Sequence, residues 1–238
     1  AEELWNARRA ASIEFVDRKG NTLDIRGPRY GRATDIAKLP AYVPQAIIAA
    51  EDKRFYEHDG ADEAAIARAV LSNTRAGETV SGASTLTQQL AKNLSLSSDR
   101  TFERKIEEVV LALWLELRLG KAGILELYLN RVYFGAGVYG IEAAAQRYFA
   151  KSARALSVPE AAIIAGLLKA PSRLSPATRP EAAASRAILV LAAMRDAGFI
   201  DDAGHAAALQ QPVTYAATDT ARAETGLEYA VDYALERL

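Results

Sequence analysis

Residues 49–60, AAEDKRFYEHDG, place two carboxylates, Glu51 and Asp52, directly after an apolar run. Another carboxylate, Glu108, lies in RKIEEVV, where helical spacing would put apolar residues on its own face. A carboxylate beside apolar surface loses hydration, which raises its pKa toward the range that a general acid or base needs near neutral pH. The alternative for Glu108 is a surface ion pair with Arg104. The residues alone favour a purely structural role for either glutamate taken singly.

Residues 81–94, SGASTLTQQLAKNL, carry a second polar group. Ser84 is a natural N-cap, and leucines at positions 86, 90 and 94 predict a buried helical stripe. The remaining side chains would form a surface of amides and one ammonium group. Such a surface suits a sugar phosphate, because amides bond to hydroxyl and N-acetyl groups while Lys binds phosphate. The alternative is the solvated polar face that most helices have. The residues of this surface are Gln88, Gln89, Lys92 and Asn93.

Three cations, Arg100, Arg104 and Lys105, begin the segment that carries Glu108. Cations at a helix N-terminus oppose the helix dipole, so three of them indicate that an anion binds there. Ion pairs with the neighbouring glutamates are the alternative.

The composition limits other function classes. The net charge is −1, from 29 basic and 30 acidic residues, so no global basic field attracts nucleic acid. The absence of cysteine excludes disulfides, thiolate metal sites and a cysteine nucleophile. The two histidines, His58 and His205, stand singly, and no metalloprotease, Walker or nucleophile-elbow motif occurs.

The elements that would position these groups are mostly helices. Residues 13–25 predict two short strands around a turn at 18–21, and almost only helical pattern follows. Asp62 and Ser157 are predicted caps, and Pro171 and Pro176 predict a loop. The predicted helices are 42–52, 62–75, 84–94, 100–118, 121–130, 137–149, 157–168, 179–197, 202–210 and 226–237.

Residues 109–115, VVLALWL, are apolar around the whole helix, which is typical of a core segment or of lipid contact. Core is the more common explanation, but we expect this run to lie near lipid. The run is far too short to span a membrane, and no apolar run of 18 residues occurs, so any lipid contact would be interfacial.

Five blocks, in order, resemble the peptidoglycan glycosyltransferases of glycosyltransferase family 51. These form the polymerase domain of class A penicillin-binding proteins and of monofunctional transglycosylases. The resemblance covers roughly residues 40–180, and five blocks in the right order make it very specific. The blocks are EDKRFYEHDG, GASTLTQQLAKN, RKIEE, ILELYLNRVYFGAGVYGIEAAAQRYF and LSVPEAAIIAGLLKAPSRLSP.

The resemblance implies a mainly α fold: a lysozyme-like helical lobe and a smaller membrane-proximal lobe, preceded by the short β-hairpin. It implies polymerisation of lipid II into β-1,4 glycan strands, with inversion at the donor's anomeric centre and release of polyprenyl pyrophosphate. Such an enzyme works in cell wall biosynthesis, on the outer face of the bacterial cytoplasmic membrane. No cofactor is required, although a divalent cation could bind at the pyrophosphate. The expected partners are lipid II, the growing glycan strand, the membrane surface, moenomycin-type inhibitors and other cell-wall synthesis proteins.

The resemblance also implies roles for particular residues. Glu51 matches the general base that deprotonates the acceptor's 4-hydroxyl, and Glu108 matches a second glutamate near the pyrophosphate. Phe55 and His58 are expected to hold the Glu51 turn by packing and hydrogen bonding, whereas Asp52 receives no role. Cations on the donor side are Lys92, Arg100 and Arg68. Further binding residues are Arg54, Ser84, Gln88, Gln89, Asn93, Arg104, Lys105 and, on the acceptor side, Lys169.

We expect a hairpin segment at 1–30, a glycosyltransferase domain at 31–215, and the start of a linker at 216–238. The tail GLEYAVDYALERL resembles the segment that leads into a transpeptidase domain, so the chain is expected to be a fragment of a bifunctional enzyme. A monofunctional enzyme is the alternative, although such a tail would be unusual in one. Two alternatives stay open: a lysozyme-like glycan hydrolase or lytic transglycosylase, and a non-catalytic glycan-binding scaffold. The hydrolase alternative does not explain the basic cluster of Lys92, Arg100 and Arg104. The scaffold alternative does not explain two carboxylates beside an anion site.

Overall fold

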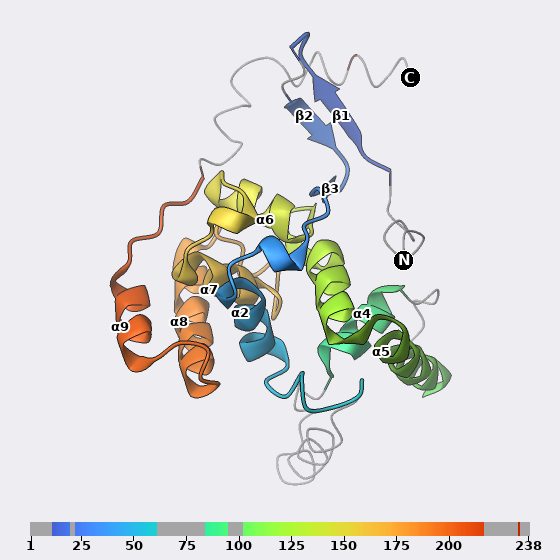
Figure 1. The fold of residues 1–238 in the computed structure, drawn as a ribbon. Coiled ribbons are helices and arrows are strands. Elements are labelled where there is room, and N and C mark those ends of the chain that lie inside the picture. Colours follow the sequence, from blue (N-terminus) through green and yellow to red (C-terminus); the bar gives the residue numbers. More distant parts are fainter. Residues whose placement is uncertain (1–10, 20–21, 61–83, 95–101, 217–232, 234–238) are drawn as a thin grey trace.

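The computed structural model describes residues 11–19, 22–60, 84–94, 102–216 and 233. Its described part is mostly helical, with two small sheets. A β-hairpin of β1 (Ile13–Val16) and β2 (Thr22–Arg26) stands apart from the helices (Figure 1), and its strands pair antiparallel as the sequence predicts. The mainly α fold with an N-terminal hairpin is therefore confirmed. The division at residues 30 and 215 stays a prediction.

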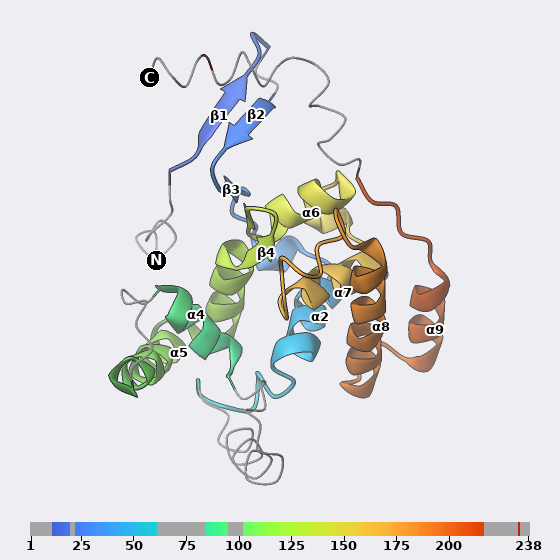
Figure 2. The same cartoon turned by 180° about the vertical axis from the view of Figure 1, so that it is seen from behind.

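The helix that ends in Glu51 lies in the core. This helix, α2 (Tyr42–Glu51), buries Val43 and an unbroken run of apolar residues at 46–49. It packs against α7 (Val158–Leu167) and α8 (Pro180–Asp196), and α9 (Asp202–Gln210) packs against α8 (Figures 1 and 2). Residues 159–167 of α7 are all buried, so α2 packs against a helix that has no solvent-exposed face.

A second group of helices faces α2 from the other side. Helix α4 (Leu86–Leu94) packs against the long α5 (Phe102–Arg131), which is the largest helix–helix contact among the described residues. Helical geometry in α5 is interrupted at Gly120, where φ is 62° and ψ is 176°. The predicted helices 100–118 and 121–130 are therefore the two halves of this interrupted element. Leu86 and Leu90 are fully buried and Leu94 partly, which confirms the predicted stripe.

A small three-stranded sheet was missed by the sequence prediction, which expected almost only helices after residue 25. It has the order β3–β5–β4, from β3 (Arg29–Tyr30), β4 (Tyr133–Gly135) and β5 (Val138–Tyr139), with β3 parallel to β5 and β4 antiparallel to it. The predicted helix 137–149 begins only at α6 (Ile141–Phe149). Positive φ at Gly135, Gly137 and Gly140 holds the preceding segment in a turn that a helix cannot contain.

The start of α7 lies where the sequence predicts a cap at Ser157. Glu160, in the first turn of α7, accepts the backbone N–H of Ser157 at 2.8 Å, as a capping box requires. Two short 3₁₀ helices, η1 (Ile36–Lys38) and η2 (Ala153–Ala155), complete the described elements. The predicted helices 62–75 and 226–237, and the cap at Asp62, lie outside the described residues. Within the described part of the chain, no helix is both long and apolar enough to cross a membrane.

Candidate active site

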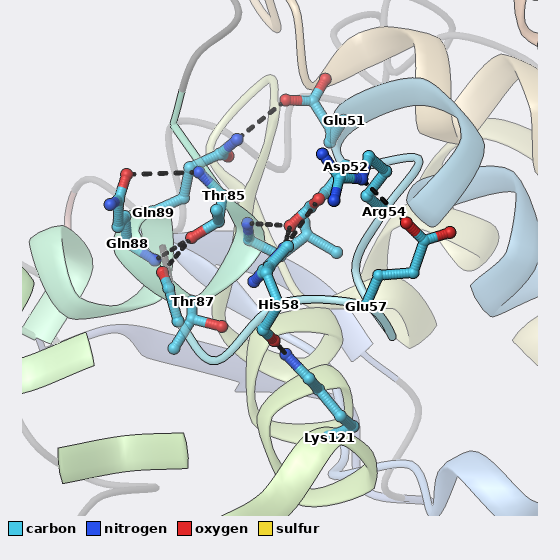
Figure 3. A network of polar contacts seen from close by, with 12 residues as sticks. Glu51, Asp52, Arg54, Glu57, His58, Thr85, Thr87, Gln88, Gln89 and Lys121 are labelled. Atoms are coloured by element: carbon cyan, nitrogen blue, oxygen red, sulfur yellow. Dashed lines mark hydrogen bonds and ion pairs between the residues drawn. The ribbon is translucent and has the colours of Figure 1, made fainter. Parts of the chain in front are cut away.

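The carboxylate pair stands at the end of α2, where the chain turns toward α4. Asp52 is buried, and its Oδ2 accepts the backbone N–H of Leu86 at 3.0 Å. His58 Nε2 donates to the same carboxylate, 3.0 Å from each oxygen (Figure 3). Asp52 therefore ties the turn at 52–60 to the first residue of α4, a role that the sequence did not assign. His58 supports the turn from within, as predicted.

The start of α4 corrects two predictions. Thr85, not Ser84, caps the helix: its Oγ1 accepts the Gln88 N–H at 3.1 Å, while Gln88 Oε1 accepts the Thr85 N–H at 3.3 Å. The Thr85 hydroxyl also donates to the carbonyl of Gly60 at 2.6 Å. Gln88 is therefore only 3% exposed and serves the cap instead of an exposed amide surface. The S/T-x-x-E/Q spacing of TLTQ was the signal for this capping box.

Gln89 connects α4 to the candidate base. Its Nε2 donates to Glu51 Oε2 at 3.0 Å, and its Oε1 accepts the hydroxyl of Tyr128 at 2.8 Å. Figure 3 shows the Gln89 side chain reaching from α4 to the Glu51 carboxylate. The structure thus brings together two residues that sequence placed in separate blocks. It adds Tyr128, which the sequence prediction did not single out.

The environment of Glu51 raises the pKa of its carboxyl group. Burial is the largest cause, and it is opposed by the hydrogen bond from Gln89 and then by the positive charges of Arg186 and Lys169. The neighbouring Asp52 adds to the increase. A partly buried carboxylate with a raised pKa accepts a proton more readily than an exposed one, which suits a general base. Arg186, on α8, is a further residue that the sequence prediction missed.

Lys121 fastens the turn to α5. Its ammonium group donates to the carbonyl of His58, to Glu116 Oε1 at 2.8 Å, and lies 4.7 Å from the centre of the Phe55 ring. The same Glu116 oxygen accepts the hydroxyl of Thr87 at 2.7 Å. One partly buried cluster, with members on both sides of the interruption at Gly120, therefore joins α5, α4 and the turn.

Other predicted residues lie on the elements around this cluster. Lys92 and Asn93 are exposed at the end of α4, and Lys169 is exposed after α7. Glu108 is 2% exposed and pairs with Lys105 at 3.2 Å. Arg54 pairs with Glu57 at 2.8 Å, and Ser84 is exposed. Arg68, Arg100 and the side chain of Arg104 lie outside the described residues. The assigned roles of all these residues stay predictions.

The first half of α5 exposes apolar side chains on one face. Five of them are 43–87% exposed, at positions spaced by three, four and one residues along the helix. Ala112 and Leu115 face the core instead. The VVLALWL run is therefore only partly core, contrary to the more common explanation. The exposed members are Ile106, Val110, Leu113, Trp114 and Leu117.

Among the described residues, no cluster of three or more histidine or acidic side chains could hold a metal ion.

Comparison with known proteins identifies related sequences. The profile of the transglycosylase family matches residues 19–195. Penicillin-binding protein 1A of Aquifex aeolicus is 45% identical over 212 residues, which is 89% of this chain and 29% of that protein. Penicillin-binding protein 1F of Bacillus subtilis is 45% identical over 190 residues, 80% of this chain and 27% of that protein. The chain thus spans less than a third of the length of these relatives.

A solved structure is also similar. The crystal structure of penicillin-binding protein 1A from Haemophilus influenzae aligns with a TM-score of 0.49 and 22% identity. The alignment covers 92% of this chain and 25% of that one.

Proposed function

Because the chain belongs to the transglycosylase family, we propose that it is a peptidoglycan glycosyltransferase of cell wall synthesis. The substrate is lipid II, which is joined to a growing glycan strand through β-1,4 links with release of polyprenyl pyrophosphate. The observation that carries the proposal is the state of Glu51: a partly buried carboxylate with a raised pKa, held at the end of α2 by a donor from α4.

Glu51 is the general base of this reaction. It removes the proton from the 4-hydroxyl of the acceptor sugar as that oxygen attacks the anomeric carbon of the donor. The bond from that carbon to the pyrophosphate breaks on the opposite face, so the configuration inverts. Glu51 is neutral after the transfer, a form that its environment favours more than water would.

The leaving pyrophosphate requires positive charge more than a proton. Lys92, exposed at the end of α4, provides charge on the donor side, together with Arg100 and Arg68. Glu108, buried beside Lys105, orients that group of cations. The supporting contacts come from Arg54, Ser84, Gln89, Asn93 and Arg104, with Lys169 on the acceptor side, whereas Gln88 contributes only by capping α4. No cofactor is required, and a divalent cation at the pyrophosphate would appear as a loss of rate on chelation with EDTA.

The exposed apolar face of α5 provides the membrane contact that a polyprenyl-linked substrate demands. We place the domain at the outer face of the bacterial cytoplasmic membrane. A phosphoglycolipid such as moenomycin, which carries the same phosphate and lipid chemistry as the donor, would compete for the site.

The test is incubation of the purified protein with lipid II in detergent, beside an enzyme of known polymerase activity. Wild type should form long glycan strands, and Glu51→Gln should lose at least about 100-fold in rate, as removal of a general base does. Shortening of existing glycan by wild type would instead support the hydrolase alternative. Binding of glycan without any turnover would support a scaffold.

A further inference from the structure

Tyr128 stands directly behind the candidate base in a chain of hydrogen bonds. Its hydroxyl donates to Gln89 Oε1 at 2.8 Å, and Gln89 Nε2 donates to Glu51 Oε2 at 3.0 Å. The Tyr128 side chain has no exposed surface, whereas Glu51 and Gln89 are both partly exposed. Tyr128 can therefore act on a substrate only through Gln89.

The NH₂ group and the carbonyl oxygen of an amide interact differently with a neighbouring carboxylate. The NH₂ group of Gln89 stabilises an ionised Glu51, whereas its carbonyl oxygen would repel the charge, because both are acceptors. The two ends are nearly identical in shape, so packing alone selects between them weakly. A donor at the far end of the amide makes the choice, because it binds the carbonyl oxygen and leaves the NH₂ group toward Glu51.

The hydroxyl of Tyr128 is protonated near neutral pH. Burial, followed by the negative charge of Glu51, raises the pKa of Tyr128 well above its usual value. The hydroxyl is therefore a permanent donor. The helix that carries Gln89 is also held in place, because Asp52 accepts the Leu86 N–H at the start of α4.

We propose that Tyr128 is a positioning residue for glycosyl transfer, whose hydroxyl keeps the Gln89 amide turned so that its NH₂ group faces Glu51. The inference rests on the proposed function. It concerns the readiness of the base and not the binding of lipid II, because Tyr128 reaches no part of the protein surface.

The variant Tyr128→Phe removes the hydroxyl and keeps the ring that fills the core. The Gln89 amide can then rotate, so Glu51 loses its donor or faces an acceptor. Both changes raise the pKa of Glu51 further, since the hydrogen bond from Gln89 lowers it. We expect kcat to fall roughly tenfold, about what one hydrogen bond provides, with KM for lipid II changed less than twofold. The acid limb of the kcat/KM profile should move to higher pH.

Tyr148→Phe is the matched control. Tyr148 is also buried, and its hydroxyl donates to a backbone carbonyl, that of Phe134, at 2.9 Å. Its loss should lower the melting temperature by a similar amount and leave the acid limb in place. If both variants reduce kcat equally and neither moves the acid limb, Tyr128 is only a core residue and the inference is wrong.

A double variant tests whether Tyr128 acts through Gln89. In a Gln89→Ala background, Tyr128→Phe should reduce kcat no further, because the amide that it orients is gone. The same tenfold loss in both backgrounds would overturn the inference. A wild-type protein that makes no glycan would instead refute the proposed function, so the two failures are distinguishable.

Discussion

At the scale of single residues, the carboxylate proposed as the general base is also a local source of instability. Burial of Glu51 favours its neutral form in the folded protein, so the charged form opposes folding. Asp52, the neighbour, is more deeply buried yet accepts hydrogen bonds from both Leu86 and His58. Of two adjacent carboxylates, Asp52 thus stabilises the structure, whereas Glu51 is the one proposed for catalysis.

Glu51→Gln should raise the melting temperature at neutral pH while it lowers the rate at least about 100-fold. The folded-state pKa lies above the ordinary value of 4.5, so stability from this group is present below that value and is lost as pH rises through the folded pKa. Gln carries no charge and can still accept from Gln89. Thermal unfolding at pH 8 and pH 4 tests this. The gain should vanish in acid, and a gain of equal size at both pH values would contradict the argument.

Lys92→Ala should reduce turnover at least about 100-fold with little change in stability, because Lys92 is exposed on the last turn of α4 and would act on the leaving pyrophosphate. Steady-state kinetics and thermal unfolding measure the two effects. Lys53→Ala, at another exposed lysine, is the control for loss of surface charge. If melting temperature and activity fall together in Lys92→Ala, Lys92 has a structural role.

The residues of the site differ in how well sequence alone could predict them. The type and place of Glu51, after a buried run and within a recognisable block, predicted its partial burial. The pairing of Gln89 with Glu51 spans 38 positions, and that of Tyr128 with Gln89 spans 39. Such contacts depend on how α4 and α5 pack together, which no local pattern contains. The sequence prediction placed Gln88 on an exposed amide surface. In the structure Gln88 takes part in the cap of α4 instead, and this role buries it.

At the scale of elements, α4 is held at both ends of its first turn. Asp52 and Thr85 fix its start, and Thr87 bonds to Glu116 of α5. Helix periodicity predicted α4 and α5 well, because apolar stripes report burial directly. It failed around residues 133–140, where the chain forms the strands β4 and β5 with a turn at glycines of positive φ. Helical propensity of the flanking residues could not reveal that turn.

Asp52→Ala should lower the free energy of unfolding by roughly 2–6 kcal/mol, because two buried donors each lose their acceptor at about 1–3 kcal/mol. Urea denaturation measures this loss. Asp35→Ala is the control, since Asp35 also accepts a backbone N–H, from Ala37 at 3.0 Å, but at an exposed cap. That change should lower the free energy of unfolding by no more than about 2 kcal/mol. Equal effects of the two variants would show that Asp52 is an ordinary cap.

Serine substitutions at Val110 and Leu117 of α5 should weaken liposome binding, because both side chains are more than half exposed on its apolar face. Flotation with anionic vesicles is the measurement. The control is the double change Ile188→Ser and Leu189→Ser on α8, which removes two apolar residues of 51% and 60% exposure from another helix. Flotation that is unchanged by the α5 pair, or is reduced equally by the α8 pair, would rule out a specific lipid contact.

At the scale of the whole molecule, the segment before α2 is fastened to elements far along the chain. Asn130, at the end of α5, accepts the backbone N–H of Thr34 at 2.7 Å and donates to its carbonyl at 2.8 Å. Tyr42, in α2, donates to the carbonyl of Leu156 at 2.6 Å. These contacts were beyond prediction from sequence, because they join positions 96 and 114 residues apart.

Asn130→Ala should destabilise the protein by roughly 2–6 kcal/mol, since it leaves the buried N–H and carbonyl of Thr34 unpaired. The slope of unfolding against urea should not change, because the same surface is exposed. Gln210→Ala, at an exposed amide in α9, should change stability by less than about 0.5 kcal/mol. A loss below about 1 kcal/mol in Asn130→Ala would show that water replaces these hydrogen bonds.

The hydrogen bond between Tyr42 and Leu156 can form only after both residues have been synthesised. During synthesis α2 and its carboxylate emerge first, while the residue that anchors the start of α2 follows 114 positions later. A nascent chain that has emerged only through α2 therefore lacks this contact until a further 114 residues have followed. The start of α2 therefore cannot reach its final packing before the segment directly ahead of α7 has been made.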